Sequence, residues 1–293
     1  MLKEAERVAT KHTKLLTSIA STPVQKDSAI VSCTTLFNVA SLWYFIDKHG
    51  EAIELLTQLQ DVLVCDPDAS TALGVRVKFT LANSHRLVAD RAKDPDTKTK
   101  HYTVAARLFQ ETYNDSTSQY GVKDMRPLTC EYKKILCQQQ SGEINNPEVI
   151  ERYEVLLRAF ETVETYDGLS IAEPALQSKF YKERSYVQNS IAGLLEESGE
   201  YDRAFELLSH LCEERRARNG DQDRNTIQSL KNLGNFLLKV KKDPAKARPL
   251  LQLAYNGASE NNGPQNFYTK KIKKLLDECS DSGDSGQASG LGR

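Results

Sequence analysis

Two stretches, SIAGLLEESGEYDRA at 190–204 and NLGNFLLKVKKDPAKA at 232–247, decide the fold of this chain. They superpose with one inserted residue in the second stretch. The superposition puts the small residues Ala192 and Gly234 at equivalent positions, 42 residues apart. Internal repetition at such a period is typical of proteins that stack copies of one supersecondary unit.

A third stretch, NVASLWYFIDKHGEA at 38–52, repeats the pattern: Ala52 follows Ala40 as Ala204 follows Ala192. A small residue on one helix lets a second helix pack closely against it. The second small residue lies on the second helix, at the point where the first helix contacts it. The polar turn between them, such as ESGEY, reverses the chain. A single hairpin of this kind cannot bury its apolar stripe, so we expect the copies to stack.

Apolar residues recur at helical spacing along most of the chain. The clearest case is 201–219, YDRAFELLSHLCEERRARN, where one broad apolar stripe faces a charged one. The stretch 73–81, LGVRVKFTL, instead alternates with a period of two, which in isolation would indicate a strand. Because a lone strand among helices has no partner, we predict a helix there as well.

The repeated residues resemble the tetratricopeptide repeat (TPR) superfamily, which has small, aromatic and alanine residues at fixed positions of a helix pair. Ala40, Trp43 and Ala52 match this pattern in one copy, and Ala192 and Tyr201 match it in another. The long repeat step is similar to that of kinesin-light-chain-type repeats. The resemblance implies an all-α fold, a right-handed superhelical solenoid of antiparallel helix pairs.

The repeats and the local composition divide the chain of 293 residues into three parts. We expect an N-terminal helix and linker at 1–28, a TPR-like helical repeat domain at 29–279, and a disordered Gly/Ser-rich tail at 280–293. The repeat domain should contain about five helix pairs and a capping helix near 264–279. The pairs should begin near residues 29, 69, 126, 173 and 224. The repeat register within 69–115 stays open.

Composition excludes several classes of protein. Thirty-nine Lys and Arg against 40 Asp and Glu give a net charge of −1, which argues against a globally basic nucleic-acid-binding protein. No run of about 18 apolar residues is present, so we expect no membrane span. The six cysteines form no CxxC pair, and we expect reduced, mostly buried thiols in a cytoplasmic protein. The sequence leaves the oligomeric state open.

The sequence offers no candidate for catalysis. The five histidines have no HExxH spacing, and there is no P-loop and no GxGxxG turn after a strand. Acidic pairs such as Glu196 and Glu197 lie on a helical face without the desolvated pocket that acid–base chemistry requires. We therefore expect a protein that is not an enzyme, with no catalytic residues, no metal site and no cofactor.

The charge distribution is more informative than the motifs. The window from Lys231 to Lys274 holds ten basic residues and only two acidic ones, Asp243 and Glu260, for a net charge of +8. This local field could steer an acidic partner, and aromatic residues that would stack on nucleic-acid bases are not interleaved with it. A basic, solubilising outer face and cap would account for the window without any ligand, and it is the simpler explanation.

By the family's pattern, certain positions of each first helix point into the concave groove. The candidate peptide-binding residues at these positions are Tyr186, Asn189, Gln228, Lys231, Asn232, Asn235 and Lys239. Amide side chains can bond to a peptide backbone, and a lysine can meet a carboxylate. The preceding repeat lacks the basic residues of a complete carboxylate clamp, so we expect no clamp of that kind.

The resemblance thus implies a non-enzymatic adaptor or scaffold that binds an extended or helical segment of a partner protein in its groove, and this segment could be acidic. Two alternatives stay open at this point. One is a structural subunit of a larger assembly, bound through its convex face or edges. The other is a helical-repeat subunit of an enzyme.

Overall fold

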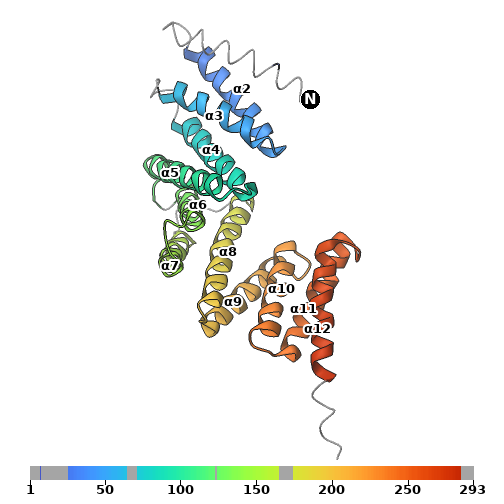
Figure 1. Cartoon of the computed structure of the whole chain (residues 1–293). Coiled ribbons are helices and arrows are strands. Elements are labelled where there is room, and N and C mark those ends of the chain that lie inside the picture. The colour runs from blue at the N-terminus through green and yellow to red at the C-terminus, as the bar shows by residue number, and fades with distance from the viewer. Residues whose placement is uncertain (1–6, 8–25, 65–70, 123, 165–173, 285–293) are drawn as a thin grey trace, which may run out of the picture. The chain divides into compact units, whose positions relative to one another are not determined.

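The computed structural model describes residues 7, 26–64, 71–122, 124–164 and 174–284. Most of the predicted N-terminal helix lies outside the described residues, as does the predicted tail beyond residue 284. Residues 280–284, which were predicted to belong to the disordered tail, instead form the end of the last helix. Within the described ranges every regular element is an α-helix and no strand occurs. The chain divides into two compact units, Met1–Phe180 and Tyr181–Arg293, which we treat separately (Figure 1).

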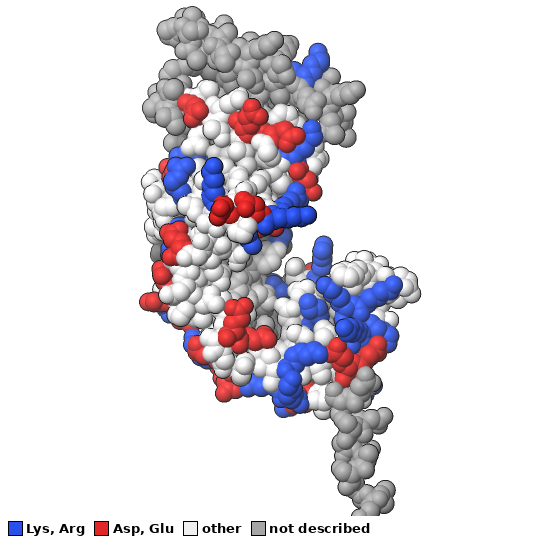
Figure 2. All heavy atoms as spheres, viewed as in Figure 1, with Lys and Arg blue, Asp and Glu red and all other residues white. Residues whose placement is uncertain are grey.

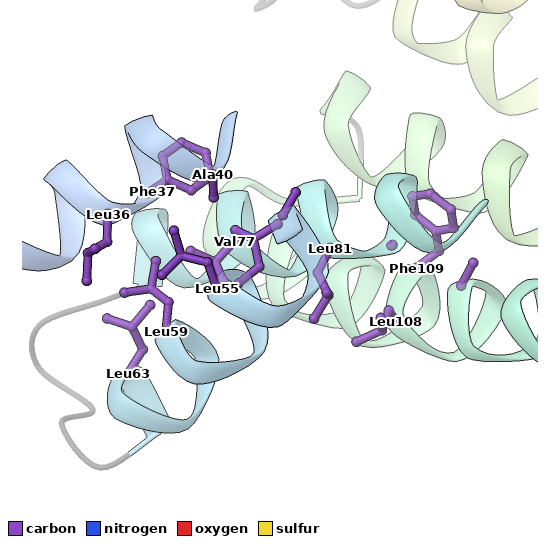
Figure 3. Packing of buried hydrophobic residues seen from close by; sticks show 14 of the residues in the cluster. Leu36, Phe37, Ala40, Leu55, Leu59, Leu63, Val77, Leu81, Leu108 and Phe109 are labelled. Carbon is purple, nitrogen blue, oxygen red and sulfur yellow. The ribbon is translucent and has the colours of Figure 1, made fainter. Parts of the chain in front are cut away.

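Unit 1 contains three helix pairs, in which each helix packs against its neighbour in the sequence (Figure 1). These helices are α2 (Lys26–Phe45), α3 (His49–Val64), α4 (Thr71–Arg91), α5 (Pro95–Tyr120), α6 (Met125–Ser141) and α7 (Asn146–Glu164). Figure 3 shows how side chains from α2, α3, α4 and α5 meet in one apolar core, in which Leu59 and Phe109 are almost fully buried. The repeated small residues Ala40 and Ala52 are fully buried in the same core.

Helix α8 (Pro174–Glu197) begins in unit 1 and continues into unit 2. The other helices of unit 2 are α9 (Tyr201–Asn219), α10 (Arg224–Lys239), α11 (Pro244–Asn262) and α12 (Phe267–Asp284). The described helices thus follow one another along the chain as five pairs and a closing helix. The pairs begin at Lys26, Thr71, Met125, Pro174 and Arg224.

The repeated small residues act as the sequence predicts. Ala204 and Ala247 are fully buried. A Cβ atom added to Gly234 of α10 would lie 2.7 Å from Cγ of Leu251, which is itself fully buried in α11. The absence of a side chain at this position thus allows the two helices to approach closely.

The stretch 73–81 is helical, as predicted, and forms the first half of α4. Its period-two alternation has a structural reason, because α4 packs against α2, α3 and α5. A helix with neighbours on several sides buries residues all around its surface, here Val75, Val77 and Leu81. Burial of this kind does not produce a single apolar stripe.

Helix ends follow the expected local chemistry. Asp223 precedes α10, and its Oδ1 accepts hydrogen bonds from the backbone N–H groups of Asn225 and Thr226. Gly142 ends α6 in the left-handed conformation, with a φ of 77°. The cysteines that the structure describes are buried and unbridged, while Cys65 lies outside the described residues.

Candidate peptide-binding site

Four side chains of unit 2 form a continuous hydrogen-bonded row, which we call the amide ladder: Asn189, Asn232, Gln228 and Tyr268. The hydroxyl of Tyr268 donates to Oε1 of Gln228 at 2.9 Å, and Nε2 of Gln228 donates to Oδ1 of Asn232 at 2.6 Å. Nδ2 of Asn232 donates to Oδ1 of Asn189 at 3.2 Å. Nδ2 of Asn189 in turn donates to the carbonyl oxygen of Ser185 at 2.8 Å. The ladder therefore connects α8, α10 and α12.

Lys231 lies on α10 beside the amide ladder. Its side chain is partly buried, and its Nζ lies 5.7 Å from the centre of the Tyr268 ring. Burial lowers the pKa of Lys231, and the positive charge of Lys271 on α12 lowers it further. Among the described residues, no carboxylate forms an ion pair with Lys231. The ammonium group of Lys231 is thus partly desolvated, and no described carboxylate balances its charge.

Two further predicted residues flank this position. Asn235 lies one helical turn after Lys231, and its amide makes no hydrogen bond with any other described residue. Tyr186 lies one turn before Asn189 on α8 and is 39% exposed. Nζ of Lys182 lies 5.8 Å from the centre of the Tyr186 ring. The structure thus offers an unbonded amide on α10 and an exposed aromatic ring on α8, two of the three helices that carry the ladder.

Lys239 is the one predicted residue whose charge is already matched. It forms an ion pair with Glu278 of α12. The two side chains are 49% and 31% exposed, so this is a surface ion pair that contributes little to stability. The pair nevertheless makes Lys239 a weaker candidate than Lys231 for contact with a ligand carboxylate.

The groove residues predicted from the sequence include none from α12: Lys271 was counted only in the basic window, and Tyr268 was not singled out. Tyr268 completes the amide ladder, and Lys271 adds to the positive field at Lys231. A signal was present, because Tyr268 follows Gln228, and Lys271 follows Lys231, by the same 40 residues. Phe267, 73% exposed, adds an aromatic ring whose centre lies 4.5 Å from Nζ of Lys271.

Figure 2 shows Lys and Arg gathered over the C-terminal helices of unit 2. Four of the ten basic residues in the predicted window form ion pairs with Glu278, Asp202, Asp243 and Asp277. The other six form no ion pair with any described residue: Lys231, Lys242, Arg248, Lys270, Lys271 and Lys274. The positive field predicted from the sequence is thus only partly compensated within the part of the chain that the structure describes.

The described residues contain no group of three or more His, Cys, Asp or Glu side chains that could hold a metal ion. None of the described helices combines the length and the apolar composition needed to cross a membrane.

No protein-family model matches the sequence, and no curated protein matches it either. Among solved structures, the chain is similar to a variant of a kinesin light chain from Podosopora anserina with nearly identical TPR-like repeats. The two superpose with a TM-score of 0.55 at 14% sequence identity, over 78% of this chain and 94% of that one. A second structure of these repeats gives a TM-score of 0.49 at 14% identity, over 87% of this chain and 97% of that one. The apo form of RapI superposes with a TM-score of 0.49 at 10% sequence identity, over 94% of this chain and 92% of that one. Identity this low establishes the fold alone: the chain is an all-α protein with the TPR-like fold of stacked helix pairs.

Proposed function

We propose that this protein is a non-enzymatic adaptor or scaffold that binds an acidic, extended segment of a partner protein across α8, α10 and α12. The observation that carries the proposal is Lys231, a partly buried cation that no described carboxylate neutralises. A ligand carboxylate placed at Lys231 would form a charge-assisted hydrogen bond and offset the repulsion from Lys271. The buried, unbridged cysteines support a cytoplasmic location for this adaptor.

The amide ladder suits an extended ligand. A side-chain amide has two N–H donors, and Asn189, Asn232 and Gln228 each use one of them in the ladder. The second N–H of each can bond to a peptide carbonyl group, while the ladder itself holds the amide planes in fixed orientations. Because an extended peptide exposes unpaired backbone groups, a row of preoriented amides would bind it without requiring a particular sequence.

The positive field would supply the preference for acidic ligands. Lys231 and Lys271 repel each other, and Lys270 and Lys274 on α12 lie exposed without ion pairs to described residues. An acidic segment would reduce this repulsion, whereas a basic segment would increase it. The proposal therefore predicts that binding weakens as the salt concentration rises.

The test is a selection of displayed short peptides on the full-length chain, followed by fluorescence anisotropy with the enriched peptides. We expect the enriched sequences to contain Asp or Glu. Lys231→Glu should weaken their binding by about ten- to hundredfold, the scale of one charge-assisted hydrogen bond. Lys242→Glu is the matched control, since Lys242 lies in the same basic window, is exposed and has no described ion pair. It should change affinity less than about twofold, the size of a screened surface charge.

Two outcomes would contradict the groove assignment. Enrichment of neutral or basic peptides would show that the positive field does not select the ligand. Equal affinity in wild type and Lys231→Glu would favour the alternative of a structural subunit bound through its convex face or edges. No arrangement of the described side chains favours the other alternative, a helical-repeat subunit of an enzyme.

A further inference from the structure

Unit 1 contains a cleft that the proposed function does not use. Its volume is about 570 Å3, and residues of α5, α6 and α7 line it. Leu128, Leu156 and Tyr113 contribute apolar surface. The volume lies within the range of pockets that accept a few side chains or a small molecule.

The two cations inside the cleft both pair with the same carboxylate, that of Glu131. Oε2 of Glu131 accepts a hydrogen bond from Nζ of Lys134 at 2.6 Å, and Nζ of Lys134 also donates to Oε1 of Gln110 at 2.8 Å. Oε1 of Glu131 lies 3.5 Å from Nη2 of Arg152. Because Lys134 and Arg152 are both engaged with Glu131, neither is available to attract an acidic ligand.

The rim of the cleft carries unmatched negative charge. Among the described residues, Glu148 forms an ion pair only with Arg152, at 3.7 Å. Arg152 also pairs with Glu131, so its charge is shared between the two carboxylates. The side chain of Glu148 is 48% exposed. Glu151 is exposed and forms no ion pair with any described residue. Three carboxylates thus face two cations in the cleft, and the excess charge lies at the solvent edge.

An apolar side chain lies directly beside this charge. Val155, one helical turn after Glu151, lines the cleft and is 54% exposed. An exposed aliphatic side chain next to unmatched carboxylates can contact a segment that carries both an apolar and a basic side chain. The partner segment must then carry a positive charge beside its apolar side chain.

We propose that the unit 1 cleft docks a short basic segment of a partner protein. In this arrangement an aliphatic side chain packs against Leu128, Val155 and Leu156. A neighbouring arginine or lysine forms an ion pair with Glu148 and Glu151. The cleft thus selects a ligand of opposite charge to the one proposed for unit 2, so the chain would join two partner segments of different character.

The test uses displayed short peptides selected on the full-length chain, with binding of the enriched peptides measured by anisotropy. We expect a class of peptides that combines Arg or Lys with Leu, Ile, Val or Met. The double variant Glu148→Lys, Glu151→Lys should weaken this class at least about tenfold, because it replaces two attractive charges by repulsive ones. Val155→Ser should weaken it as well, because it removes the apolar contact without changing the charge of the rim.

Two controls separate this site from others. Glu54→Lys reverses an exposed charge on α3 that has no described ion pair, and it should leave binding unchanged. Lys231→Glu should also leave it unchanged, so this proposal and the one for unit 2 can fail independently. Chemical unfolding of each variant would confirm that the surface substitutions leave the fold intact.

Three results would overturn the proposal. One is a selection that enriches no peptide with both a basic and an aliphatic residue. Another is enrichment of such peptides with equal affinity for wild type and the double charge-reversal variant. The third is concentration-dependent self-association in light scattering that the double variant abolishes, which would make the occupant a second copy of this chain.

Discussion

The close approach of α10 and α11 at Gly234 predicts a pair of glycine substitutions with opposite effects on stability. Gly193 and Gly234 both lie in helices of unit 2. A Cβ atom at Gly193 meets nothing within 4 Å, whereas a Cβ atom at Gly234 lies 2.7 Å from Leu251 Cγ and 2.9 Å from its Cδ2. Because Leu251 is fully buried, it has little space into which to move.

The magnitudes follow from two opposing contributions. Replacing glycine by alanine within a helix stabilises the helix by about 1 kcal/mol. Overpacking a buried site costs about 1–3 kcal/mol. Gly193→Ala has only the first contribution and should stabilise the protein by up to about 1 kcal/mol. Gly234→Ala has both and should destabilise it by up to about 2 kcal/mol.

The assay is urea unfolding of both variants and wild type, followed by circular dichroism. Because the helix-propensity contribution is common to both variants, their difference in unfolding free energy isolates the packing contribution, about 1–3 kcal/mol. If Gly234→Ala stabilises the protein as much as Gly193→Ala does, the reasoning from small repeat residues to close helix packing is wrong.

Three other predictions test local features. Leu208→Ala should destabilise the protein by about 2–5 kcal/mol, because Leu208 is 8% exposed; a loss below about 0.5 kcal/mol in urea unfolding would contradict its place in the core. Asp223→Ala should cost about 1 kcal/mol by removing the N-cap of α10, measurable in the same assay; no loss would contradict the cap. Burial, His101 and Arg107 lower the pKa of His85 to about 4. The unfolded chain therefore takes up this proton first as the pH falls, and stability should decline between about pH 6.5 and 4 by up to about 3 kcal/mol. His85→Gln should flatten that decline, and an equally steep decline in the variant would contradict the assignment.

The fold could be predicted from the sequence because short-range signals agree with the repeat. The helix pairs beginning at Met125, Pro174 and Arg224 start within one residue of the predicted positions. Each start combines an apolar stripe with a local signal, such as the N-cap Asp223 or the proline at 174. The register within 69–115 could not be fixed, because α4 contacts three helices and buries residues on several sides.

The candidate site was predictable only in part. Gln228, Asn232 and Asn189 were selected from the repeat register, and the structure brings them into one hydrogen-bonded row. Tyr268 and Lys271 are absent from the predicted groove residues because the helix that carries them is predicted to be a cap, although Lys271 belongs to the predicted basic window. The ion pair between Lys239 and Glu278 also could not be foreseen, since it depends on how α12 packs in three dimensions.

Peptide binding across α8, α10 and α12 is tested most directly by a nitrogen-15 NMR titration of the chain with an enriched acidic peptide, read at the side-chain amide groups. We expect the resonances of Asn189, Asn232 and Asn235 to shift as the peptide is added. Those of Gln252 and Asn256, which bond to each other on α11, should stay in place. Shifts confined to Gln252 and Asn256, with the ladder amides unchanged, would contradict binding across α8, α10 and α12.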